Sequence, residues 1–433
     1  MAVLTVIAIA VFAHGLVSKR LRTTIVTAPM VFVAIGLLTG SQALGVATVD
    51  LGSAEVIILA ELTLSIMLFS DAVRVDPSMV RSFIGIPARM LGIGLPLSIA
   101  AGTAVARLVF DLPWSEAALL GSILAATDAA LGQAVLADHS VPARIRSSLN
   151  VESGLNDGLA LPAVTLFIAV TLAEAEADAE PAAYWIRFVA EQIGFGVLAG
   201  AVIGAGAGWL LLRARRAGWV DGINAQLSAL ALVGLAYLSA EGLGGNAFIA
   251  AFIAGASFRL VGGHQAEHLT EFTEDSGQLL ASITFVVFGN ALLGPTLDDL
   301  TLAIAVFVVA ALTVTRMVPI GLSLSGTGLR TPTIAFLGWF GPRGLASILF
   351  ALIVLEETGS DVDDQLFVVV SWTVLASVVL HGASASWSAR RYGVWYERHR
   401  DAVHEEHEPA EGPMDDDEVR PRIRWMPRTG GRR

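Results

Sequence analysis

Residues 150–158 read NVESGLNDG and lie inside an apolar run at about residues 144–172. A run of that length can cross a lipid bilayer as a helix. An ionised side chain near the bilayer centre costs at least about 2.5 kcal/mol, so Glu152 and Asp157 are expensive residues in such a helix. Acidic side chains in a membrane span indicate a functional site or a buried ion pair, and both need partners elsewhere in the chain.

The overall composition is that of a membrane protein. Of the 433 residues, 55% are hydrophobic and 15% are charged, whereas soluble domains carry about 25% charged residues. Because cysteine is absent, the chain is neither a disulfide scaffold nor a thiolate metal protein. The net charge of −12 excludes a basic nucleic-acid-binding protein, and the chain is too apolar to be disordered. We therefore predict an all-α polytopic membrane protein whose partner is the lipid bilayer and not a nucleic acid.

Apolar runs long enough to cross a bilayer recur along most of the chain. The first run has no preceding basic segment, so we expect no cleaved signal peptide. Residues 393–433 are rich in charge and lack apolar periodicity, which predicts a mostly disordered cytoplasmic tail. Residues 1–392 would form the transmembrane domain, with about 13 helices at roughly 2–17, 25–44, 51–70, 85–108, 114–137, 144–172, 185–212, 224–241, 246–260, 276–293, 299–323, 332–355 and 365–389.

Charged loop residues alternate in sign in register with these runs. Lys and Arg in short loops mark the cytoplasmic side, which predicts a plasma-membrane protein with its N-terminus outside and its C-terminus in the cytoplasm. The basic loop residues are Lys19, Arg20, Arg22, Arg74, Arg81, Arg144, Arg146, Arg213, Arg215, Arg216, Arg259, Arg330, Arg390 and Arg391. The opposite loops carry Asp50, Asp111, Glu174, Glu176, Asp178, Glu180, Asp298, Asp299, Glu356, Glu357, Asp361, Asp363 and Asp364.

A second acidic residue lies at a similar depth in a neighbouring run. Thr127-Asp128 comes about 14 residues into the fifth run, near mid-membrane at 1.5 Å per residue. Asp157 lies at a comparable depth from the same side. Hard cations prefer oxygen ligands, so Thr127, Asp128, Ser153 and Asp157 predict a cation site. The alternative is a buried polar network that only holds helices together.

Two arginines lie inside later apolar runs, Arg316 in the eleventh and Arg343 in the twelfth. Buried ions are tolerated when they are paired. We predict an ion pair between Glu152 and Arg316, with Arg343 as the second candidate or as a shared partner. Such a pair would hold helices together rather than bind a substrate.

The twelfth run is interrupted by Gly338-Trp339-Phe340-Gly341-Pro342, as a broken transmembrane helix would be. A break around Thr127–Asp128 in the fifth run would be its counterpart. Two interrupted segments in corresponding halves are typical of inverted repeats with a site where the segments cross. The repeats would be the fourth to sixth and the eleventh to thirteenth runs.

These motifs resemble those of the monovalent cation/proton antiporter family, specifically the NhaP-type Na⁺/H⁺ antiporters related to sodium/proton exchangers. The resemblance covers about residues 1–390 and rests on Thr127-Asp128, Glu152-Ser153-xx-Asn156-Asp157, and Gly341-xx-Gly344 around Arg343. It implies a transporter for sodium exchange and pH homeostasis, not an enzyme, with no cofactor. It also implies an antiporter fold and a homodimer, with core helices at about 85–172 and 299–389 and dimerisation helices at about 1–70 and 224–293.

The resemblance further implies roles for single residues. In relatives, an acidic residue at the end of the third run often joins the ion site. Asp71 matches that position, and Glu61 is the second choice for it. Ala129 stands where many relatives carry Pro, which affects the local shape of the break. The implied ion-binding and proton-carrying residues are Asp157, Asp128, Thr127, Ser153, Asn156 and Asp71, and Na⁺ would contact the first four.

A mechanism follows from electrostatics. A partly dehydrated cavity favours protonated Asp157, and a cation beside it favours the ionised form. Proton and Na⁺ would then compete for one carboxylate, and an empty charged site would cross the membrane poorly. The resemblance implies that members with Asn156-Asp157 exchange one proton per cation, electroneutrally. Na⁺ or Li⁺ is the expected cation, with K⁺ as the alternative.

Two other classes are compatible with aspartates at one depth. An intramembrane aspartyl protease holds two carboxylates that share a proton, but its Gly-x-Gly-Asp motif is replaced here by Gly154-Leu155-Asn156-Asp157. A cation channel would conduct without coupling cation movement to proton movement. Cation-driven pH change without membrane current separates the exchanger from the channel.

Overall fold

The computed structural model is built from helices, without a strand in the residues that it describes, which are 2–21, 24–75, 85–128, 130–175, 182–359 and 362–404. In these residues, nine helical segments are long and apolar enough to cross a membrane. The predicted runs at 25–44 and 246–260 appear as shorter apolar helices. The runs at 114–137 and 332–355 are each divided into shorter helices, so the number of crossings stays a prediction.

The helices follow the predicted runs in order. Three short π-helical segments, η1, η3 and η4, lie inside longer helices. The elements are α1 (Ala2–Leu21), α2 (Ala28–Thr39), α3 (Ala54–Arg74), α5 (Gly85–Arg89), η1 (Met90–Gly94), α6 (Leu95–Phe110), α7 (Trp114–Ile123), η2 (Ala130–Gly132), α8 (Gln133–Leu136), α9 (Ala143–Ala175), α10 (Ala182–Val202), η3 (Ile203–Ala207), α11 (Gly208–Arg216), α12 (Gly222–Gly242), α13 (Ala247–Gly262), α14 (His264–Leu269), α15 (Glu271–Val287), η4 (Phe288–Leu293), η5 (Leu297–Asp299), α16 (Leu302–Leu312), α17 (Val314–Ser323), α18 (Thr331–Trp339), α19 (Leu345–Thr358) and α20 (Asp364–His404).

Side-chain caps set several of the helix starts. The Asp221 carboxylate accepts a hydrogen bond from the Asn224 N–H at the start of α12. Asn246 accepts from two backbone N–H groups at the start of α13. Such caps satisfy backbone donors that have no partner within the helix. Polar residues between apolar runs therefore act as start signals for the helices that follow.

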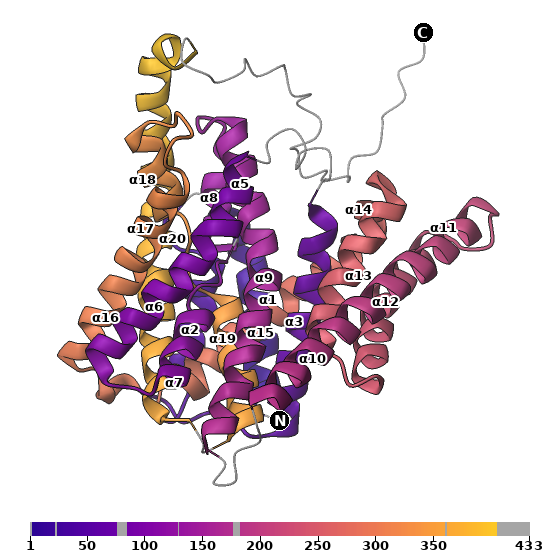
Figure 1. The fold of residues 1–433 in the computed structure, drawn as a ribbon, viewed down its shortest axis with the longest axis horizontal. Coiled ribbons are helices and arrows are strands. Elements are labelled where there is room, and N and C mark those ends of the chain that lie inside the picture. Colours follow the sequence, from indigo (N-terminus) through magenta and orange to yellow (C-terminus); the bar gives the residue numbers. More distant parts are fainter. Residues whose placement is uncertain are drawn as a thin grey trace.

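The helices pack as two bundles (Figure 1). One contains α10–α13 together with α2, α3 and α15, and the other contains α5–α9 and α16–α20. Helix α3 makes the main contacts between them, against α9 and α19. The predicted run at 185–212 was assigned to neither the core nor the dimerisation helices. Its helix α10 packs with α12 and α13. The boundary between the bundles therefore runs along α3, the helix that carries Asp71.

Both predicted interruptions are confirmed. Helix α7 ends at Ile123, and regular structure resumes only at η2. Helix α18 ends at Trp339, and α19 begins at Leu345. The backbone groups at these four helix ends have no partners within their own helices.

The last helix is longer than predicted. Helix α20 continues to His404, so residues 393–404 of the predicted tail are helical. Rings one turn apart support this extension, because Tyr392 stacks on Trp395 and Trp395 stacks on His399. Hydropathy alone misses such a helix because its residues are mostly polar and its contacts are aromatic.

Several predicted features lie outside the described residues. They are the loop charges Arg22, Arg81, Glu176, Asp178, Glu180 and Asp361, the break residue Ala129, and the tail from residue 405 onwards.

We expect Gly255→Ala to destabilise the protein. Helix α13 crosses α3 so closely that a Cβ at Gly255 would lie 2.3 Å from the carbonyl oxygen of Phe69. Relieving that overlap should cost about 1–3 kcal/mol, measured as a lower unfolding midpoint in detergent. A Cβ at Gly234 of α12 meets nothing within 4 Å, so Gly234→Ala serves as the control and should be neutral or stabilising. Equal effects of the two substitutions would contradict the close crossing.

Candidate functional site

The two interrupted helices meet at their breaks. The backbone N–H of Asp128 donates to the carbonyl oxygen of Pro342 at 2.8 Å. The carboxylate of Asp128 accepts from the N–H of Leu345, the first residue of α19, also at 2.8 Å. A carboxylate at a helix N-terminus is favourable because unpaired N–H groups and the helix dipole both attract it. Asp128 is thus both a carboxylate of the site and a cap for α19.

The carbonyl groups at the end of α7 are also satisfied from the other break. The Arg343 guanidinium donates to the carbonyls of Ala125 and Ala126 at 2.8 and 3.2 Å. The Ser347 hydroxyl donates to the carbonyl of Ile123 at 2.9 Å. These polar groups replace the hydrogen bonds that an unbroken helix would make.

Arg343, the second candidate or shared partner for Glu152, does not form an ion pair with it. Among the described residues, no carboxylate lies within ion-pair distance of Arg343. Its partners are the carbonyl oxygens of Ala125 and Ala126, which carry partial negative charge at the end of α7. Arg343 stabilises the break, and Glu152 is held by another arginine.

The two glycines of the Gly341-xx-Gly344 motif make room for charged side chains. A Cβ at Gly341 would lie 2.2 Å from Nε of Arg316. A Cβ at Gly344 would lie 2.2 Å from Oδ2 of Asp128. Only glycine leaves these side chains in place. The motif thus has a direct steric cause.

The predicted ion pair between Glu152 and Arg316 is present. Arg316 donates to both carboxylate oxygens of Glu152, at 2.7 and 3.0 Å, and both residues are at most 2% exposed. The Asn156 amide donates to the same carboxylate at 3.0 Å. Bidentate geometry and a third donor are what a buried pair needs to offset desolvation. This pair ties α9 to α17 within the membrane.

Five of the six predicted site residues line one cavity of about 260 Å³ between the bundles. This acidic cavity is lined by Asp71 of α3, Thr127 and Asp128 at the break after α7, and Ser153 and Asp157 of α9. Asn156, the sixth, does not line it, because its amide turns to Glu152. Three carboxylates and two hydroxyls thus face a common space with room for a cation and water.

Three oxygens of residues that line the acidic cavity have no hydrogen-bond partner among the described residues. They are the hydroxyl oxygens of Ser70 and Thr127 and one carboxylate oxygen of Asp157, and all three atoms are buried. Sequence reasoning missed Ser70, which lies next to Asp71 on α3. Buried polar atoms are nearly always paired with protein, water or ligand. These three oxygens therefore have the character of ligand atoms for a species that enters the cavity.

The mouth of the acidic cavity carries residues that sequence reasoning missed. Arg74 and Glu274 line it and form an ion pair in which the Arg74 Nε donates at 3.0 Å. Arg74 also lies 3.7 Å from Asp71. Arg74 was predicted only as a loop charge, and nothing in the local sequence links it to Glu274, 200 residues away.

Glu61, the second choice for the acidic position on α3, lies elsewhere. Its carboxylate accepts a hydrogen bond from the Tyr237 hydroxyl at 2.8 Å, and it does not line the acidic cavity. Asp71 is therefore the acidic residue of α3 that reaches the site.

We expect Glu152→Gln to destabilise the protein by about 3–5 kcal/mol, because it leaves the buried Arg316 charge unpaired. Chemical unfolding in detergent measures this loss. The exposed Glu55 of α3 provides the matched control, and Glu55→Gln should change little. Combining Glu152→Gln with Arg316→Met should recover most of the loss, since neither charge of the pair remains. A double variant as unstable as the single one would argue against a paired role.

The sequence is similar to curated transporters. It is 26% identical over 382 residues to the K(+)/H(+) antiporter NhaP2 of Shewanella sp. (strain ANA-3), covering 86% of this chain and 63% of the relative. It is 28% identical over 312 residues to the Na(+)/H(+) antiporter ApNhaP of Aphanothece halophytica, covering 69% of this chain and 57% of the relative. The chain thus spans less than two thirds of the length of these relatives.

The fold is similar to that of a solved structure. The sodium proton antiporter MjNhaP1 from Methanocaldococcus jannaschii at pH 8 superposes with a TM-score of 0.74 at 17% identity, covering 91% of this chain and 100% of that chain. This likeness shows an antiporter fold. The sequence also matches the family described as "Sodium/hydrogen exchanger, transmembrane" over residues 6–391, and the chain therefore belongs to the sodium/hydrogen exchanger family of membrane proteins.

Proposed function

We propose that the protein is a secondary active transporter that exchanges Na⁺ or Li⁺ for H⁺ across the membrane. The observation that carries this proposal is the set of unpartnered oxygens, on Ser70, Thr127 and Asp157, in the acidic cavity. Their hard oxygen chemistry suits a small monovalent cation. Membership of the sodium/hydrogen exchanger family supports the same conclusion.

Asp157 is the group on which cation and proton compete. It faces the acidic cavity near two further carboxylates, Asp71 and Asp128. Low dielectric and like charges favour protonation of such a carboxyl group when no cation is bound. A bound cation reverses this preference, because its charge stabilises the ionised carboxylate. Binding one substrate therefore releases the other.

Exchange of one proton per cation, which is electroneutral, requires that Asp157 alone gains and loses the proton. The neighbouring position is Asn156, whose amide donates to Glu152. An amide cannot carry a proton on and off the site, whereas an aspartate there could. Glu152 is held by Arg316 in a buried pair and is not available for this role.

Alternating access requires the acidic cavity to open on each side of the membrane in turn. The cavity reaches the half-exposed ion pair of Arg74 and Glu274 at one end. Helix α3 also packs against α19. We infer that this contact closes the acidic cavity toward the opposite side of the membrane. Movement of the bundle with α7 and α19 against α3 would open that contact and close the mouth.

K⁺ is the alternative cation. The NhaP2 relatives are named K(+)/H(+) antiporters, so K⁺/H⁺ exchange at the same site is the second candidate. Both candidates use the same carboxylates and differ in the size of the ion that the oxygens accept.

We further propose a plasma-membrane location, with the N-terminus outside and the C-terminus in the cytoplasm, and a homodimer. The orientation is supported by the alternating loop charges, which put Arg213, Arg215 and Arg216 inside and Asp298 and Asp299 outside. In the homodimer, helices at about 1–70 and 224–293 would form the interface, and helices at about 85–172 and 299–389 would move as the core.

We expect Asp157→Asn to abolish exchange in proteoliposomes, because asparagine neither releases a proton nor attracts a cation. The measurement is internal pH after adding Na⁺, Li⁺ or K⁺ outside. The matched control is Asp111→Asn, since Asp111 is 94% exposed on its side chain and lies outside the acidic cavity. Substantial Na⁺-dependent proton movement by Asp157→Asn would overturn the assignment.

The same assay separates the rival functions. An electroneutral exchanger gives full pH change when the membrane potential is clamped to zero, with Na⁺ and Li⁺ more effective than K⁺. If K⁺ alone drives proton movement, the second candidate is correct. A current that accompanies Na⁺ entry without proton movement would indicate a channel.

We expect single cysteines to report the orientation, because the chain has no cysteine of its own. Asp299→Cys and Arg215→Cys both replace exposed side chains. A membrane-impermeant maleimide should label Asp299→Cys in intact cells and Arg215→Cys only after permeabilisation. The reverse pattern would place the N-terminus in the cytoplasm.

A further inference from the structure

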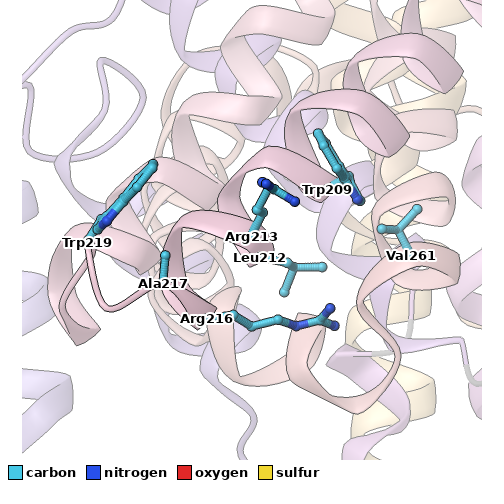
Figure 2. Close-up of a pocket in the computed structure, with 7 residues that line it drawn as sticks. All are labelled: Trp209, Leu212, Arg213, Arg216, Ala217, Trp219 and Val261. Atoms are coloured by element: carbon cyan, nitrogen blue, oxygen red, sulfur yellow. The ribbon is translucent and has the colours of Figure 1, made fainter.

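A second cavity, of about 450 Å³, lies where α11 ends and shares no residue with the acidic cavity. We call it the arginine cavity. Figure 2 shows the Arg213 and Arg216 side chains on either side of Leu212, with Trp209 beside Arg213 and Val261 of α13 across from them. The residues that define it are Trp209, Leu212, Arg213, Arg216, Trp219 and Val261.

The arginine cavity lies at the end of a candidate membrane span. Arg216 is the last residue of the candidate membrane span that begins at Arg187. Trp209 and Trp219 are 51% and 80% exposed, although tryptophan is largely apolar. Exposed tryptophans at the end of a span are typical of the membrane–water interface. The cavity therefore offers cationic groups and an apolar floor at the boundary between acyl chains and water.

The two arginines have no anionic partner in the described part of the chain. The Arg213 guanidinium lies over the Trp209 ring, 5.5 Å from its centroid, which fixes its direction without neutralising its charge. Two carboxylates at the ends of the neighbouring helices bind other groups of the protein. Asp221 caps α12, and Glu267 pairs with Arg259 at 2.6 Å.

The end of α11 does not need these side chains as caps. The backbone N–H groups of Ala217 and Gly218 donate to the carbonyls of Arg213 and Arg215, at 3.0 Å each. Gly218 has a φ of 73°, which allows the chain to turn back over the helix end. The guanidinium groups of Arg213 and Arg216 are thus left for an external anion.

We propose that the arginine cavity binds the phosphate group of an anionic phospholipid. Arginine recognises phosphate through paired N–H donors, and basic pockets between membrane helices suit acidic headgroups. Leu212 and Val261 provide an apolar surface for the first acyl carbons. The proposal requires only that the chain lies in a membrane, and it is independent of the transported cation.

The test measures lipid binding to the purified full chain in detergent. Phosphatidylglycerol and phosphatidylcholine with matched acyl chains are titrated, and bound lipid is counted by native mass spectrometry. We expect a preference for phosphatidylglycerol that falls about fivefold with Arg213→Gln or Arg216→Gln and roughly 25-fold with both. Arg215→Gln is the matched control, because it removes the same charge from the same helix outside the cavity, and it should keep the preference.

Each other outcome is informative. Arg213→Lys with Arg216→Lys keeps the charge and should retain part of the preference, which excludes misfolding as the cause of the loss. The proposal is wrong if the double glutamine variant binds phosphatidylglycerol as well as Arg215→Gln does. It is also wrong if inorganic phosphate competes as tightly as the lipid, or if the double variant changes only the oligomeric state, since a second copy would then cover this face.

Discussion

The backbone amide of Asp128 donates to the Pro342 carbonyl, and the Asp128 carboxylate accepts from Leu345, so each broken helix completes the hydrogen bonding of the other. In the bilayer core, no water is present to form hydrogen bonds with these backbone groups. Arg343 adds donors to the carbonyls at the end of α7. The irregular backbone at the two breaks and the Asp128 carboxylate depend on this contact, because it supplies the hydrogen bonds that lower their free-energy cost.

Helix α9 separates structural charge from functional charge on two adjacent faces. Glu152 and Asn156, one turn apart, are bonded to each other, and Glu152 is bonded to Arg316, so the Glu152 charge is paired. Ser153 and Asp157, also one turn apart, face the acidic cavity, and one oxygen of Asp157 is left without a partner. The face with the ion pair fixes the position of the face that lines the cavity. A cation site that must bind and release needs that combination of rigid support and incomplete coordination.

Much of this arrangement could be predicted from the sequence, for physical reasons that also set its limits. Charges inside apolar runs are rare, so the pairing of Glu152 with Arg316 follows from elimination. Arg343 was the second candidate or a shared partner for that pair, yet its partners are carbonyl groups that become available only where α7 breaks. Arg74 at the mouth was missed because its partner, Glu274, lies 200 residues away and only packing brings them together. The extension of α20 rests on ring stacking, which hydropathy does not record.

The central claim is that a cation displaces a proton from Asp157. Calorimetric titration of Na⁺ into the purified protein, repeated in buffers of different ionisation enthalpy, counts the protons released per ion bound. The account predicts that the binding heat varies with the buffer in proportion to about one proton per Na⁺, and that Asp157→Asn removes this dependence. Na⁺ binding with the same heat in every buffer would contradict it.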